Sequence, residues 1–177
     1  MRIKTAALIT AAFLLMVASC AWAKEGDQTI EGTFNYGTEA FNDLGNQYGV
    51  TAGYGFEFRD RWQARADLSY YRTSTATMGA TLTGIRVPLD LGLRYLIPLP
   101  KVNKELTAFG QGGVEISVDD WRPAVGAART SDTRFGAVIG GGAEYALDPQ
   151  FGAVVNVQYH VIEDGYLSAG IGMAYHF

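Results

Sequence analysis

Residues 48–59 read YGVTAGYGFEFR, and within this stretch large apolar side chains alternate with small or polar ones. One side of an extended chain here carries Tyr48, Val50, Ala52, Tyr54, Phe56 and Phe58. The other side carries glycine, threonine, Glu57 and Arg59. Successive side chains of a β-strand point to opposite faces, so the stretch predicts a strand with one apolar and one polar face. The alternation alone also suits a soluble sandwich or a lipocalin-like carrier.

The same period of two recurs along the rest of the chain, with turn residues between the copies. It predicts further strands over residues 30–38, 62–71, 83–95, 106–118, 135–147, 151–161 and 167–177. The 22 glycines, interleaved with 10 tyrosines and 9 phenylalanines, are typical of many short strands. The chain is therefore predicted to be all-β, with about eight antiparallel strands in up-and-down order.

The charges within these strands share one face and comprise arginine, aspartate and glutamate but no lysine. Arginine paired with carboxylate is typical of an enclosed site, because its planar fork satisfies several acceptors at once. We therefore expect the charged face to line the interior of a barrel and the uncharged face to contact lipid. The predicted interior charge network comprises Glu57, Arg65, Asp67, Arg86, Asp90, Arg94, Glu115 and Glu144.

A sheet that spans a membrane has to close on itself, because an open edge leaves backbone groups unpaired in hydrocarbon. Eight strands enclose an interior that side chains can fill. A paired network that plugs the lumen is favoured, and a narrow ion path is the alternative.

The predicted connections alternate in length. Those at 59–61, 98–105 and 148–150 are short or marked by proline, whereas those at 38–47, 72–80 and 119–132 are longer and polar. Membrane barrels have short periplasmic turns and longer extracellular loops. Trp121 and Arg122 are thus expected in an extracellular loop, where they could contact a surface partner or anchor the chain at the interface.

Residues 1–23 have the three regions of a secretory signal: a basic start, an apolar stretch over 6–18, and Ala21-Trp22-Ala23 as the cleavage site. We expect cleavage after Ala23, so that residues 24–177 form the mature domain. Two alternatives are a permanent N-terminal membrane helix and lipidation of Cys20 within the box at 17–20.

Composition limits the chemistry further. The formal net charge is −4 and no lysine or arginine cluster is present, which argues against nucleic-acid binding. The single cysteine, Cys20, lies in the predicted signal, so a disulfide framework or a thiolate metal site is not expected. His176 has no second histidine nearby in the sequence, and neither a metal site nor a cofactor is predicted.

Several segments resemble the small outer-membrane β-barrel family that includes OmpA-like and OmpX-like proteins. They are residues 87–95 (VPLDLGLRY), 135–137 (FGA) and 140–145 (GGGAEY). The resemblance implies a bacterial outer-membrane location, contact with outer-membrane lipids and lipopolysaccharide, and a monomer. The alternating C-terminal residues look like the family's signal for the barrel-assembly machinery: Ile171, Met173, Tyr175 and Phe177.

One set of residues suggests catalysis. If the last hairpin turns at 163–165, His160 faces Ser168 across two strands. Glu163 and Asp164 are then close enough to orient the imidazole, with Asp164 as the candidate acid. Some small outer-membrane barrels are lipid A acylhydrolases or acyltransferases. The deacylase group carries its serine two residues after the histidine, where this chain has Ile162. The alternative is a hydrogen-bonded polar pair without catalysis, which we favour.

The predicted function is therefore a structural, adhesion or envelope-interaction role through extracellular loops, without catalysis. The alternatives are a lipid-modifying enzyme, a narrow channel, and a soluble or lipid-anchored carrier.

Overall fold

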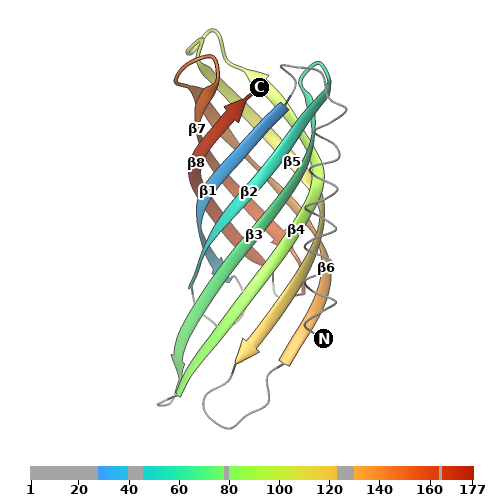
Figure 1. Ribbon diagram of the computed structural model, residues 1–177, viewed down its shortest axis with the longest axis vertical. Coiled ribbons are helices and arrows are strands. Elements are labelled where there is room, and N and C mark those ends of the chain that lie inside the picture. Colours follow the sequence, from blue (N-terminus) through green and yellow to red (C-terminus); the bar gives the residue numbers. More distant parts are fainter. Residues whose placement is uncertain (1–27, 40–45, 78–79, 123–129, 164) are drawn as a thin grey trace.

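The computed structural model describes residues 28–39, 46–77, 80–122, 130–163 and 165–177. These residues form one closed barrel, in which each strand pairs antiparallel with its neighbours in sequence order (Figure 1). The strands are β1 (Gln28–Glu39), β2 (Asn46–Arg59), β3 (Trp62–Thr77), β4 (Ala80–Pro98), β5 (Leu106–Arg122), β6 (Thr130–Ala146), β7 (Phe151–Val161) and β8 (Tyr166–His176). The predicted eight-stranded all-β barrel is confirmed. Within the described ranges, no helix is long and apolar enough to cross a membrane.

Strand β8 closes the barrel against β1. Their register runs from Thr29 opposite His176 to Glu39 opposite Tyr166. Beyond this ladder, the Gln28 amide donates to the Phe177 carbonyl at 3.3 Å, and the Phe177 amide donates to the Gln28 carbonyl at 3.1 Å. Closure therefore pairs the backbone groups that the first and last strands would otherwise leave open.

The interior of the barrel is polar and its outer surface is apolar. Each of the eight strands carries at least one large apolar side chain that points outward, such as Phe34 at 56% exposed, Phe135 at 74% and Ile171 at 64%. The largest buried side chains include Arg94 and Glu115. A water-soluble domain has the opposite distribution. The outer surface thus suits an apolar surrounding.

The two ends of the barrel differ. At one end, residues 60–61, 99–105 and 147–150 join successive strands. Strand β1 begins at this end and β8 ends there; we call it the short-turn end. The two-residue turn places Arg61 at a φ of 66°, within the left-handed region. In the third turn, Asp148 Oδ1 accepts hydrogen bonds from the amides of Gln150 and Phe151 at 2.7 and 2.8 Å. The opposite end is called the long-hairpin end.

Strands β3 to β6 extend farther than the others at the long-hairpin end (Figure 1). They have 16 to 19 residues, compared with 11 to 14 for β1, β2, β7 and β8. Pairing continues to Thr77 opposite Ala80, and to Trp121 opposite Thr130. The prediction of long loops is therefore wrong for residues 72–77, 119–122 and 130–132, which belong to strands. Threonine is also favoured in strands that lie in water. The alternation of apolar residues ends where the barrel leaves the lipid, whereas the strands continue beyond that point.

Aromatic rings collect near both ends of the outer surface. The ring pairs at the short-turn end are Trp62–Tyr95 and Phe151–Tyr175, with centroids 4.9 and 5.0 Å apart. Toward the long-hairpin end, Tyr36 and Tyr48 lie 5.2 Å apart. Two bands of amphipathic rings are typical of a barrel that spans a bilayer.

Candidate functional site

Two arginines and two carboxylates cross the interior on the side of the short-turn end. Glu31 Oε2 accepts hydrogen bonds from Arg65 Nη1 at 2.9 Å and from Arg94 Nη1 at 2.8 Å. Arg65 also forms a two-point ion pair with Asp67 of its own strand. All four side chains are buried and their formal charges cancel. We call this set the central network.

Further contacts hold Arg94 in place. Its Nε and Nη2 donate to Gln111 Oε1 at 3.0 and 2.8 Å. Its guanidinium lies 3.8 Å from the ring centroid of Phe109, a cation–π arrangement. Arg94 is 2% exposed, so every one of these contacts forms away from bulk water.

A second ion pair lies nearer the long-hairpin end. Arg86 donates from Nε and Nη2 to the two carboxylate oxygens of Asp119 at 3.0 and 3.1 Å. Ser117 Oγ donates to Asp119 Oδ1 at 2.9 Å, and the Arg86 guanidinium lies 4.8 Å from the Tyr166 ring centroid. The sequence placed Asp119 at the start of a loop, but it is a fully buried residue of β5.

Three inward carboxylates lie side by side on adjacent strands. Asp67 of β3 is directly opposite Asp90 of β4, and Asp90 is directly opposite Glu115 of β5. Arg65 neutralises Asp67, whereas Asp90 Oδ1 is buried without a hydrogen-bond partner among the described residues. We call Asp67, Asp90 and Glu115 the carboxylate row.

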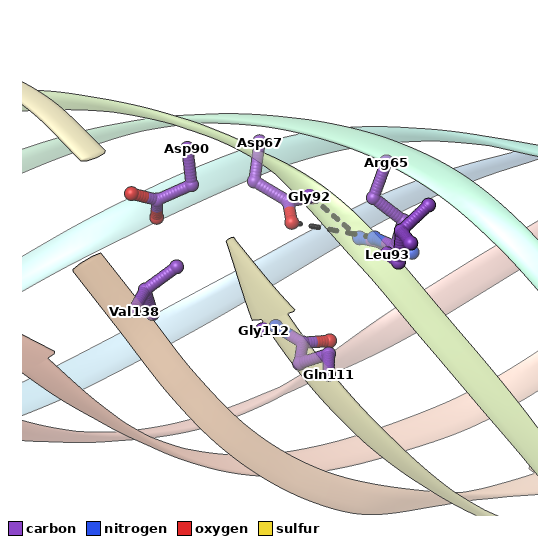
Figure 2. A pocket seen from close by; sticks show the side chains of 8 residues that line it. All are labelled: Arg65, Asp67, Asp90, Gly92, Leu93, Gln111, Gly112 and Val138. Atoms are coloured by element: carbon purple, nitrogen blue, oxygen red, sulfur yellow. Dashed lines mark hydrogen bonds and ion pairs between the residues drawn. The ribbon is translucent and has the colours of Figure 1, made fainter. Parts of the chain in front are cut away.

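A small cavity borders this row. Figure 2 shows Asp90 and Asp67 on one side of it, with Arg65 held to Asp67 and Gln111 facing them. Its volume of about 10 Å³ is near the space that one water molecule needs.

His160 lies between Glu115 and Ser168. Its Nδ1 is 2.7 Å from Glu115 Oε2, and its Nε2 is 3.1 Å from Ser168 Oγ. The imidazole stacks on the ring of Tyr166, with centroids 4.0 Å apart and an interplanar angle of 4°. The structure thus brings His160 and Ser168 together as the sequence suggests. The carboxylate that orients the imidazole is Glu115, whereas Asp164 lies outside the described residues.

Serine, imidazole and carboxylate in series also form the arrangement of a nucleophile, a base and an orienting acid. Ser168 is only 1% exposed, however, and His160 is fully buried. Both side chains point into the interior, so an acyl chain in the surrounding lipid lies on the other side of the barrel wall. The geometry therefore favours a buried polar support that ties β5, β7 and β8 together.

The mouth at the short-turn end holds a separate histidine–carboxylate pair. His176 Nε2 contacts Glu144 Oε1 at 2.5 Å, and His176 Nδ1 lies 3.2 Å from Thr29 Oγ1. These residues line a cavity of about 120 Å³ that also includes Glu57. Glu57 was predicted in the interior network, but its Oε1 accepts a hydrogen bond from the Arg61 amide in the adjoining turn at 2.9 Å. Its position at the strand end explains the difference.

Two other sets of predicted residues can be located. The backbones of Trp121 and Arg122 form the last two residues of β5, opposite Gly84 and Thr83, and not a loop as predicted. Residues 123–129, the middle of the predicted loop, lie outside the described residues. The C-terminal set is arranged as follows: Ile171 and Met173 point outward, and the Tyr175 ring lies 5.0 Å from Phe151 and 5.7 Å from Phe177.

Comparison with known families agrees with this inside-out barrel. The sequence matches the family described as "Outer membrane protein beta-barrel domain" over residues 9–177. The chain belongs to this family. No curated protein matches the sequence.

Solved structures of outer-membrane barrels share the fold of this family member. Ail, the attachment invasion locus protein of Yersinia pestis, is 17% identical, with a TM-score of 0.60 over 87% of this chain and 100% of its own. OprG of Pseudomonas aeruginosa is 16% identical, with a TM-score of 0.66 over 88% of this chain and 97% of its own. Neisserial surface protein A is 11% identical, with a TM-score of 0.60 over 85% and 96%. At these identities the likeness concerns the fold alone.

Family membership gives the barrel its location and orientation. The protein is an integral protein of the bacterial outer membrane, and its apolar outer surface contacts lipid. Outer-membrane barrels extend farther on the extracellular side than on the periplasmic side. The extended ends of β3 to β6 therefore assign the short-turn end, where β1 begins and β8 ends, to the periplasm. The long-hairpin end, with the extended β3 to β6, faces outward from the cell.

Proposed function

We propose that this protein is a plugged outer-membrane barrel that binds partners at the cell surface through the outer parts of hairpins β3–β4 and β5–β6. The observation that carries the proposal is the extension of these four strands beyond their neighbours at the long-hairpin end. A paired sheet presents a more fixed surface than a free loop, which lowers the entropy lost on binding.

The name of one structural relative supports the class of function. Ail is described as an attachment invasion locus protein, and it has also been solved with the heparin analogue sucrose octasulfate. Adhesion at the surface of a host or neighbouring cell is therefore the activity that we propose for this chain.

The central network supports the absence of a channel. Arg65 and Arg94 meet on a single oxygen of Glu31 inside the barrel, and opening a path there would separate buried charges at considerable cost. Purified protein in planar bilayers should give no stable conductance. Steady channel openings by wild-type protein would contradict this part of the proposal.

A pair of shortened hairpins tests the binding role. In the first hairpin, the dipeptide Asn-Gly replaces residues 74–83 and joins Thr73 to its paired residue Gly84. In the second hairpin, Asn-Gly replaces residues 120–131 and joins Asp119 to its paired residue Asp132. Cells of a non-adherent bacterium that display wild-type protein should adhere to cultured epithelial monolayers and to heparin-coated plates. Cells with both hairpins shortened should adhere no better than cells without the protein.

The control is the amount of folded barrel in the outer membrane, measured by gel mobility without boiling. Equal adhesion by the shortened and wild-type proteins, at equal amounts of folded barrel, would overturn the proposal. So would wild-type cells that adhere no better than the empty host.

We infer the assembly route and partners from the same architecture. The segment 1–23 is proposed as a cleaved signal, and the C-terminal residues ending in Phe177 as the site read by the barrel-assembly machinery. Lipopolysaccharide is the proposed lipid around the outer aromatic band near Tyr36 and Tyr48. Because pairing of β1 with β8 leaves no open edge along the barrel, we propose a monomer. Light scattering in detergent that gave a dimer mass would contradict the monomer.

A further inference from the structure

The carboxylate row carries more negative charge than the described arginines offset. Arg65 and Arg94 balance Glu31 and Asp67 in the central network. Farther along, Arg86 and Arg134 lie near Asp119 and Asp132. Asp90 and Glu115 remain, directly opposite each other on β4 and β5 and almost completely buried. Like charges in directly opposite strand positions repel, and burial increases the cost.

Two oxygens in this region have no hydrogen-bond partner among the described residues. They are Asp90 Oδ1 and Glu115 Oε1, and both are shielded from solvent. A buried carboxylate oxygen without a donor is costly. The unpartnered atoms therefore point to a positively charged ligand between the two strands.

The third group at this position is His160. One ligand atom each from Asp90, Glu115 and His160 lie within 4.8 Å of one another, and all three residues are buried. Ligand atoms about 2.0–2.2 Å from a metal ion are separated by on the order of 3–4 Å. Small side-chain rotations would bring the three atoms to those separations.

The surroundings of His160 suit a metal ligand. A bound metal ion would replace the proton that lies between Nδ1 and Glu115, and Nε2–H would then donate to Ser168 Oγ, which lies 3.1 Å away. Such an outer hydrogen bond fixes the tautomer and ring orientation of metal-binding histidines. The stacked ring of Tyr166 holds the imidazole plane as well.

We propose that Asp90, Glu115 and His160 form an interior binding site for one divalent transition-metal ion. One imidazole nitrogen with two carboxylate oxygens is a donor set that suits Zn²⁺, and it is less suited to Mg²⁺ or Ca²⁺, which prefer oxygen alone. The two positive charges cancel those of Asp90 and Glu115. A cavity of about 10 Å³, near the space that one water molecule needs, borders the site on the side of Asp90 (Figure 2). The sequence predicted no metal site, because its ligands come from three separate strands.

Metal titration of the intact barrel tests the site. Protein extracted from outer membranes is treated with EDTA, returned to metal-free detergent and titrated with ZnCl₂ in a calorimeter. Wild-type protein should bind one Zn²⁺. Asp90→Asn and His160→Asn should each weaken binding by more than 10-fold, and Ser168→Ala should weaken it by about 10–100-fold through the outer hydrogen bond. Co²⁺ should give visible absorption bands that His160→Asn abolishes.

Glu144→Gln is the matched control, because Glu144 and His176 form the other histidine–carboxylate pair of the barrel interior. This variant should bind Zn²⁺ as wild type does, and the gel mobility of every unboiled variant verifies its folding. Absence of saturable binding by wild type would overturn the proposal. The negative charges of the carboxylate row would then be neutralised by bound protons. Unchanged binding in folded Asp90→Asn, or loss of binding in Glu144→Gln, would overturn it as well.

Discussion

Arg94 Nη1 lies 2.8 Å from Glu31 Oε2, and this contact joins β4 to β1 across the barrel interior. The two residues are 63 positions apart in the sequence. Arg65 of β3 reaches the same oxygen, so one carboxylate links three strands. Glu31 is consequently the residue on which the central network depends most.

Glu31→Gln should destabilise the barrel strongly. Arg65 keeps Asp67 as a counter-ion, but Arg94 is left with Gln111 as its hydrogen-bond acceptor. Loss of one partner of a buried ion pair costs about 3–5 kcal/mol. Urea unfolding in lipid vesicles measures the free energy. The control Glu163→Gln, at an exposed position, should change it by less than about 0.5 kcal/mol. Equal stabilities of the two variants would contradict the network.

Gly53→Ala tests the packing beside the same network. A Cβ at residue 53 would overlap Asp67 Oδ1 and Arg65 Nη2, so the ion pair would have to move. Overpacking of this kind costs about 1–3 kcal/mol in the free energy of unfolding. Gly32→Ala is the matched control on a neighbouring strand, since a Cβ there meets no atom within 4 Å. A destabilisation as large in Gly32→Ala as in Gly53→Ala would show that the clash is not the cause.

Phe177→Ala should lower the amount of folded barrel in the outer membrane, because the C-terminal residues are proposed as the assembly signal. The fraction of protein that migrates faster without boiling gives the amount that is folded. Phe135→Ala is the control, since it removes the same side chain from the lipid-facing surface of β6. Equal folded fractions for the two variants would argue against a special role of the C-terminus.

The mature N-terminus should be Lys24. Mass spectrometry of protein from outer membranes should give the mass of residues 24–177 without lipid. The alternative result is the mass of residues 20–177 with lipid attached, absent from the Cys20→Ser variant. That result would contradict cleavage after Ala23 and indicate lipoprotein processing.

The sequence was sufficient for the architecture because alternation of side chains is a local property. Each strand carries its inward and outward faces in its own residues, as 48–59 does, and the absence of lysine among the strand charges indicated which face was enclosed. The residues at which strands end were harder to predict from the sequence. Residues 72–77 and 119–122 continue β3 and β5 beyond the alternation of apolar residues. Backbone pairing between strands outside the membrane does not require apolar side chains.

The interior contacts depended on register across strands. His160 and Ser168 could be matched because one tight hairpin joins their strands. Glu115 comes from β5, and its distance to His160 follows from the stagger of β5, β6 and β7, which no local pattern records. Asp119 could have been found, because it continues the inward alternation of Glu115 and Ser117.

The most direct test of the inside-out arrangement is a spin-label scan along β7. Single cysteines at positions 155 to 158 in a Cys20→Ser background are labelled and reconstituted in lipid vesicles. Labels at Val155 and Val157, which point outward, should collide freely with oxygen dissolved in the lipid and little with a water-soluble nickel chelate. Labels at Asn156 and Gln158 should be shielded from oxygen, giving a period of two. The opposite phase, or outward labels that the nickel chelate reaches freely, would contradict a lipid-facing apolar surface.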